Sequence, residues 1–259
     1  MNTLLTRRCL WKVAPLAIPL AGRASAADAL TVPDSFPYQQ ADVVREMVTV
    51  AHGNFKRVKE LVDARPALAR AAVDWGFGDW EDALGAASHV GNREIAEYLI
   101  GKGARPTLFS ATMLGQLDTV KAFVAAQPGV QQIAGPHSIS LLAHAKNGGK
   151  QAEAVYQYLD ALGDAGAKKA ATLEASEITA LTGVYLFGTG ATERIEITEK
   201  NGQLIFMRVG KSARGLVHLG GHTFHPAGAA AVRIHFSGAG ENATLTVEDP
   251  DLIVTARRS

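Results

Sequence analysis

The chain has 259 residues, 47% of them hydrophobic, and its 26 basic and 25 acidic side chains give a formal net charge of +1. This length suits one large domain or two small ones, and the apolar content is ordinary for a folded protein. Because the charges nearly cancel, the composition excludes a strong basic field for nucleic acid, and the single cysteine, Cys9, excludes an internal disulfide.

Residues 1–26 are typical of an export signal. Arg7 and Arg8 stand before an apolar stretch, Val13 to Ala21, that is too short to span a bilayer as a stable helix. Ala24-Ser25-Ala26 then supplies the small-x-small pattern that a signal peptidase recognises. The segment resembles a twin-arginine signal, which implies a periplasmic or secreted protein with no stable membrane anchor after cleavage. An ordinary secretory signal or an uncleaved anchor is the alternative.

After an extended lead-in over residues 27–42, residues 43–162 read as amphipathic helix pairs separated by glycine turns. Gly53, Gly91 and Gly115 begin similar segments, in which the apolar side chains five and eight residues later share one helical face. Gly149 begins a looser copy. One such pair cannot bury its own apolar face, so we expect the pairs to stack around a continuous core.

The residues on either side of Gly91 resemble an ankyrin repeat. Asp82 to Ser88 occupies the place of the family's Thr-Pro-Leu-His-x-Ala-Ala, and Leu99 to Pro106 looks like its helix-ending Leu-Leu-x-x-Gly-Ala-Asp. The resemblance implies a concave surface that recognises a protein or peptide partner. The turn glycines, however, are 38, 24 and 34 residues apart, whereas the family repeats every 33 or so. A generic bundle of helical hairpins is the alternative.

The first connection between these copies, residues 74–82, is rich in aromatic residues. We interpret Trp75, Phe77 and Trp80 as candidate anchors for a partner, because large aromatic side chains dominate many interfaces. The alternative is that the rings cap the helical core. His89 and His137, near helix ends, are further partner-binding candidates, or else bond backbone carbonyls in a structural role.

A linker over residues 163–178 precedes a region, residues 179–259, in which polar and apolar residues alternate. Asn201-Gly202 is typical of a tight hairpin turn. Seven short strands are expected, over residues 184–187, 194–199, 203–209, 215–219, 231–236, 242–247 and 252–256. The region predicts a small antiparallel barrel or sandwich, and the chain as a whole is expected to be an α+β protein in two segregated parts.

Part of this region resembles a known accessory domain. The matching residues are Leu181 to Tyr185, Asn201 to Leu204, Phe224, and the closing segments Leu245 to Val247 and Ala256-Arg257. They are similar to the lipocalin-like β-domain that follows serine hydrolases of the beta-lactamase and penicillin-binding type. The resemblance implies an accessory role, because catalysis in that family lies in a separate domain.

The sequence contains no catalytic motif that we recognise, and we expect no cofactor. Ser-x-x-Lys, Gly-x-Ser-x-Gly and His-Glu-x-x-His are absent from it. His218, His222 and His225 are weak candidates for a metal site, since imidazole binds zinc and copper, but no carboxylate lies between them. Loop histidines scattered over the β-domain are the alternative.

Three arginines of the β-domain, Arg208, Arg214 and Arg233, would clamp an anion if they faced a barrel interior, or else lie on its surface. We therefore expect an exported, non-catalytic binding or scaffolding protein that recognises a protein or peptide through its repeats. A small-ligand or metal carrier centred on the β-domain is the second hypothesis, and it predicts a ligand-sized apolar cavity. A hydrolase with a dispersed active site is the third.

Overall fold

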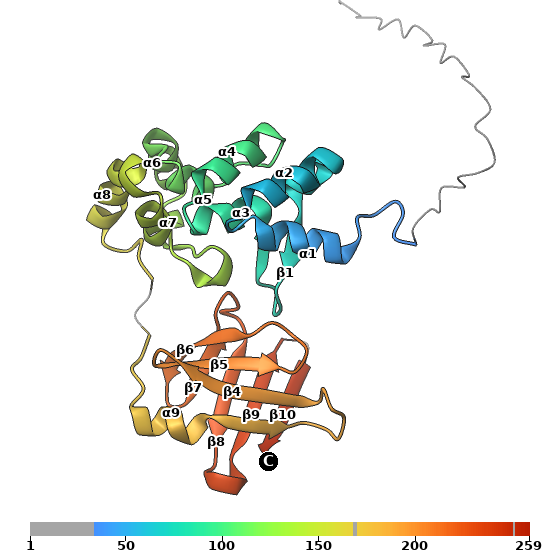
Figure 1. Cartoon of the computed structure of the whole chain (residues 1–259). Coiled ribbons are helices and arrows are strands. Elements are labelled where there is room, and N and C mark those ends of the chain that lie inside the picture. The colour runs from blue at the N-terminus through green and yellow to red at the C-terminus, as the bar shows by residue number, and fades with distance from the viewer. Residues whose placement is uncertain (1–33, 168–169, 251) are drawn as a thin grey trace, which may run out of the picture. The chain divides into compact units, whose positions relative to one another are not determined.

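The computed structural model describes residues 34–167, 170–250 and 252–259 (Figure 1). The chain divides into two units, residues 1–38 and 39–259, and the architecture below is that of the second. The expected export signal over residues 1–26 lies outside the described residues. Within the described ranges, no helix has both the length and the apolar character needed to cross a bilayer.

Residues 41–162 are mainly helical, and short polar side chains fix where several helices begin. The side chain of Asn54 accepts a hydrogen bond from the backbone N–H of Arg57, and that of Asn92 accepts one from Ile95. The α-helices of this region are α1 (Ala41–Val50), α2 (Phe55–Ala64), α3 (Ala83–His89), α4 (Arg93–Gly101), α5 (Leu108–Met113), α6 (Leu117–Ala126), α7 (Leu141–Asn147) and α8 (Glu153–Leu162).

The helices pack as consecutive pairs, from α1 with α2 to α7 with α8, and α3 and α5 also contact the first helices of neighbouring pairs. Buried apolar residues fill the space between them, among them Leu84 and Leu99 in one cluster and Leu141 and Leu159 in another. Each pair therefore buries its apolar face against its neighbours. The ankyrin resemblance itself stays a prediction.

A short hairpin, which we call the finger, connects α2 to α3. Its strands are β1 (Ala72–Asp74) and β2 (Trp80–Asp82), paired antiparallel. The tip turns through Gly76, Phe77 and Gly78, all at positive φ, a conformation that glycine adopts without steric cost. The sequence predicts only an irregular connection here, because strands of three residues are too short to show an alternating pattern.

The C-terminal region is a closed antiparallel barrel of eight strands, which α9 (Ala175–Leu181) precedes. Its strands are β3 (Gly183–Leu186), β4 (Arg194–Lys200), β5 (Gln203–Arg208), β6 (Arg214–Gly220), β7 (Thr223–Pro226), β8 (Arg233–Ser237), β9 (Thr244–Asp249) and β10 (Leu252–Arg258). The barrel closes where β10 pairs with β3, and alternate side chains such as Ile195, Ile197 and Tyr185 fill its core. The α+β prediction is confirmed, and the β-region is a barrel rather than a sandwich.

Each of the seven expected strands overlaps an observed one, but β7 was not expected. This strand has only four residues, follows the Gly220-Gly221 turn and ends at Pro226, which cannot donate a ladder hydrogen bond. Its Phe224 is nevertheless fully buried in the barrel core. A strand of four residues is too short to show an alternating pattern, so its pairing with β6 and β8 is what identifies it.

Candidate functional site

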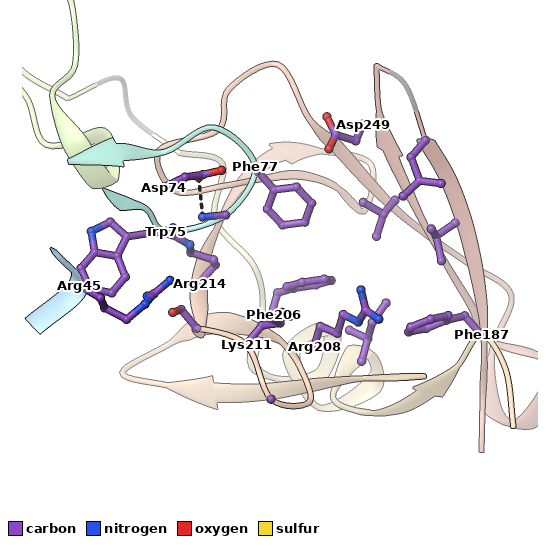
Figure 2. Close-up of a pocket in the computed structure, with 17 residues that line it drawn as sticks. Arg45, Asp74, Trp75, Phe77, Phe187, Phe206, Arg208, Lys211, Arg214 and Asp249 are labelled. Carbon is purple, nitrogen blue, oxygen red and sulfur yellow. Dashed lines mark hydrogen bonds between the residues drawn. The ribbon is translucent and has the colours of Figure 1, made fainter. Parts of the chain in front are cut away.

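A cavity of about 570 Å³ lies between the finger and the mouth of the barrel (Figure 2). The barrel contributes an apolar surface to it from β4, β5, β9 and β10, which includes Ile195, Phe206, Val247 and Val254. The finger contributes the segment from Asp74 to Phe77. The cavity is therefore bounded by two parts of the chain that lie far apart in the sequence.

Four basic side chains line the same cavity, against two acidic ones, Asp74 and Asp249: the basic residues are Arg45, Arg208, Lys211 and Arg214. Two of the arginines lie over aromatic rings, which orients their guanidinium groups. Arg45 lies 5.0 Å from the centre of the Trp75 ring, and Arg208 lies 5.4 Å from that of Phe187. The cavity thus combines an apolar wall with an excess of positive charge.

The three aromatic residues of the finger have different surroundings. The ring of Phe77 packs against the barrel core, with its centre 5.8 Å from that of Phe206. Trp75 lines the cavity, and its indole N–H donates a hydrogen bond to Glu81. Trp80 is 64% exposed. Of the predicted anchors, Phe77 therefore contacts the chain's own barrel, and Trp80 is the one open to solvent.

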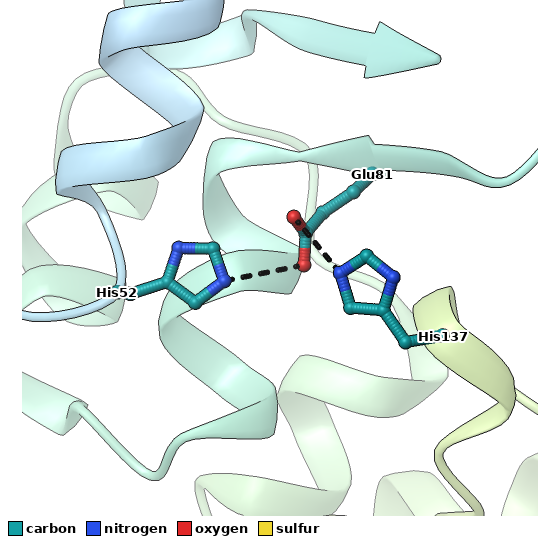
Figure 3. A group of neighbouring side chains, drawn as sticks. All are labelled: His52, Glu81 and His137. Atoms are coloured by element: carbon teal, nitrogen blue, oxygen red, sulfur yellow. Dashed lines mark ion pairs between the residues drawn. The ribbon is translucent and has the colours of Figure 1, made fainter. Parts of the chain in front are cut away.

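Behind the finger, three histidines surround the carboxylate of Glu81, and we call these four residues the His–Glu cluster (Figure 3 shows three of them). Glu81, on β2, is 1% exposed. His52 Nε2 lies 3.7 Å from Glu81 Oε1, His89 Nδ1 lies 3.0 Å from the same oxygen, and His137 Nε2 lies 3.5 Å from Oε2. His52 follows α1, His89 ends α3, and His137 lies in a 3-10 turn (Pro136–Ser138).

A second carboxylate holds His137 from its other side. Asp79 Oδ2 lies 2.6 Å from His137 Nδ1, and Asp79 Oδ1 accepts the backbone N–H of His137 at 2.9 Å. Arg214 of the barrel also donates to Asp79 Oδ2. Close by, the N–H of Gly228 donates to the Ser138 hydroxyl at 2.7 Å. Polar contacts therefore join the barrel to the helical region next to the His–Glu cluster.

These contacts change the pKa values of the groups that make them. Burial alone would raise the pKa of Glu81, but the close contacts and charge of His137 and His89 outweigh it and lower the pKa to about 2. The hydrogen bond to Asp79, reinforced by Glu81, raises the pKa of His137 to about 9. At neutral pH, and with no other ligand, Glu81 is therefore ionised and His137 carries a proton.

The structure brings together the predicted candidates His89 and His137, but around carboxylates rather than backbone carbonyls. Sequence reasoning missed His52, Asp79 and Glu81. A usable signal was the spacing of Asp79 and Glu81, two acids at alternate positions of a segment otherwise rich in aromatic residues. Side chains two apart on a strand share a face, so both carboxylates were placed to meet the same neighbours.

The three weak metal candidates, His218, His222 and His225, each contact different residues. His218 is buried in the barrel, stacked on Phe224 with its Nδ1 3.2 Å from the Ala171 carbonyl. His222 is 3.3 Å from Glu177, and His225 contacts the backbone oxygen of Pro226. Within the described ranges, the group of three whose ligand atoms converge is instead His52, Glu81 and His137.

The predicted anion-binding arginines divide in a similar way. Arg208 and Arg214 line the cavity, whereas Arg233 donates to the backbone carbonyls of Ala230 and Val232.

No family model matches the chain, and a search of curated proteins gives no match either.

Proposed function

We propose that the protein binds a small anionic molecule with an apolar body in the cavity between the finger and the barrel mouth. The observation that supports this proposal best is the combination of an apolar wall and an excess of basic side chains around one space of ligand size. Cavities of roughly 300–1,000 Å³ are typical of small-molecule sites, and about 570 Å³ lies within that range.

The basic side chains favour a carboxylate or phosphate group on the ligand. Asp79 already neutralises Arg214, so Arg208 and Lys211 are the side chains best able to contact a ligand anion. Within the described part of the chain, neither of them forms an ion pair with a carboxylate. A charge-assisted hydrogen bond from arginine to such an anion contributes about 1.5–3 kcal/mol to binding.

The apolar wall favours an aliphatic or aromatic body. Phe187, Phe206 and Val254 face the cavity, and burying apolar ligand surface against them contributes about 25 cal/mol per Å². Phe77 closes part of the barrel mouth above them (Figure 2). An anionic amphiphile such as a medium-chain carboxylate meets both requirements, because its chain and its head group match the two kinds of lining.

Calorimetric titration of the full chain with decanoate, and with decanol as an uncharged ligand of equal length, tests the proposal. We expect decanoate to bind at least about tenfold more tightly than decanol, and Arg208→Met to reduce that preference by about tenfold or more. Arg233→Met is the matched control, because Arg233 lies outside the cavity lining. Failure of decanoate to bind, or equal losses in both variants, would contradict the proposal.

Recognition of a protein or peptide by the helical region is a second candidate function, in which the chain is a non-catalytic binding or scaffolding protein. The observation that favours it is Trp80, whose large side chain is 64% exposed while Phe77 packs against the barrel. A partner recovered from an envelope extract should be lost with Trp80→Ala, while decanoate binding stays unchanged. The export signal expected over residues 1–26 would place either function in the periplasm or outside the cell.

A further inference from the structure

We propose that His52, Glu81 and His137 form a binding site for one divalent transition-metal ion, with Zn²⁺ as the best fit. Each residue offers one ligand atom, and the three atoms lie within 4.8 Å of one another (Figure 3). Two imidazole nitrogens and one carboxylate oxygen are a ligand set that zinc and other divalent first-row metals accept. The proposal concerns the His–Glu cluster and is independent of what the cavity binds.

The hydrogen bonds of the two histidines leave the correct nitrogen free on each ring. His52 Nδ1 lies 3.1 Å from the Val48 carbonyl oxygen and 3.0 Å from that of Thr49, so this nitrogen must carry the hydrogen. His137 Nδ1 donates in the same way to Asp79 at 2.6 Å. Both Nε2 atoms therefore face Glu81. Histidines that ligate metals are held like this, by a carbonyl or carboxylate at the other ring nitrogen.

Glu81 supplies an independent sign that this position suits a cation. Its side chain is buried, and among the described residues its Oε1 accepts no hydrogen bond of acceptable geometry, although His89 Nδ1 lies 3.0 Å away. The Trp75 indole holds the other oxygen, Oε2, at 2.7 Å. A buried carboxylate oxygen without a hydrogen-bond partner is costly, and a metal ion bound to Oε1 would satisfy it.

The distances fit tetrahedral coordination after a small adjustment. Two ligand atoms that are each about 2.1 Å from a tetrahedral zinc ion lie about 3.4 Å apart. His52 Nε2 lies 3.7 Å from Glu81 Oε1, and His137 Nε2 lies 3.5 Å from Oε2, so the two histidines approach different oxygens of the carboxylate. An ion held by one of these oxygens therefore requires one ring to shift. The His52 and His137 rings are 33% and 28% exposed, which leaves them room to turn toward one ion.

Three protein ligands leave a fourth coordination position for water or another ligand, as in catalytic rather than structural zinc sites. The rival arrangement is a permanent contact of Glu81 with His137 and His52 that no metal ion displaces. The two arrangements differ in whether Zn²⁺ binds and in which residues its binding depends on.

Calorimetric titration of the full, chelator-treated chain with ZnCl₂ distinguishes them. We expect one equivalent of Zn²⁺ to bind with a dissociation constant that His52→Ala and His137→Ala each raise by at least about tenfold. His222→Ala is the matched control, because His222 of the barrel forms a similar contact with Glu177 of α9, and the substitution should leave that equivalent unchanged. Co²⁺ should give the visible absorption of a four- or five-coordinate site in the parent chain, and His52→Ala should lose it.

Two results would overturn the proposal: no binding of Zn²⁺, or binding that both cluster variants retain. Far-UV circular dichroism in chelator shows whether each variant folds. If His137→Ala does not fold, His52→Ala decides alone, because His52 is a third exposed and its replacement leaves the core intact. Asp79→Asn keeps all three ligands but weakens the support of His137, so it should weaken Zn²⁺ binding by about tenfold.

Discussion

Arg214 of the barrel donates a hydrogen bond to Asp79 of the finger, and both side chains are almost completely buried although 135 residues separate them. The same carboxylate holds His137. A Cβ added at Gly228 would collide with it. Asp79 is therefore the point at which the finger, the helical region and the barrel make polar contact.

Arg214→Met should destabilise the protein by about 1.5–3 kcal/mol, because it removes the guanidinium partner of the buried Asp79 carboxylate and leaves His137 as its remaining charged partner. Urea unfolding measures the loss. Lys59→Met is the control: its ion pair with Asp63 is exposed and should contribute less than about 1 kcal/mol. Equal effects of the two substitutions would show that the buried contact is not what joins these elements.

Phe77→Ala should lower the free energy of unfolding by about 1–2 kcal/mol, because the half-buried ring packs against Phe206 in the barrel mouth. Trp80→Ala removes a larger ring from the same finger but an exposed one, so it should cost less than about 0.5 kcal/mol. Thermal melting of both variants checks the order. A greater loss with Trp80→Ala would contradict the packing of the finger tip.

Gly91→Ala should destabilise the helical region by at least about 2 kcal/mol. Gly91 has a φ of +78°, and an added Cβ would collide with the backbone carbonyl of Asn147. Gly101→Ala is the matched control, because Gly101 ends α4 with open space around it and should be neutral or stabilising by up to about 1 kcal/mol. Chemical denaturation of the two variants side by side gives the comparison.

His144 should make stability depend on pH between about 6.5 and 4. Burial lowers the pKa of this fully buried ring to about 4, even though the Ser140 carbonyl accepts its Nδ1–H. The unfolded chain takes up a proton at this residue below about pH 6.5, whereas the folded chain does not until about pH 4. The contribution is therefore fully present above pH 6.5 and is lost as pH falls.

The full loss from this one group is roughly 3 kcal/mol, because a pKa difference of one between the folded and unfolded chain corresponds to about 1.4 kcal/mol. Urea unfolding at intervals from pH 7 to 4 measures it. His144→Gln should flatten that part of the profile, whereas His235→Gln, at an exposed ring on the barrel, should not. Parallel profiles for the parent chain and His144→Gln would assign the pH dependence to other groups.

Much of the fold was predictable because its elements are long enough to show a period. Apolar residues at helical spacing and turn glycines such as Gly91 marked the helices, and strict alternation marked the strand from Arg194. The finger strands and β7 were not predicted, because strands of three or four residues are too short to show an alternation of polar and apolar side chains. The ankyrin and lipocalin resemblances and the export signal stay predictions.

The candidate site was predictable only in part, since its geometry depends on packing. His89, His137 and the aromatic segment were identified as individual candidates, but Glu81 lies beside Asp82 and reads as one of two solvated acids. Its burial depends on the finger returning between α1 and α3. His52 reaches it only because α1 ends against β1, a contact that no local pattern encodes.

The buried contact between Arg214 and Asp79 also limits how the chain can diverge. A neutral residue at position 79 leaves the buried Arg214 guanidinium without its carboxylate partner, whereas a neutral residue at position 214 leaves Asp79 with His137 as its remaining partner. Descendants of this sequence that lose Asp79 should therefore lose Arg214 as well. A barrel exchanged from a distant relative would have to match the Asp79 carboxylate with its own donor.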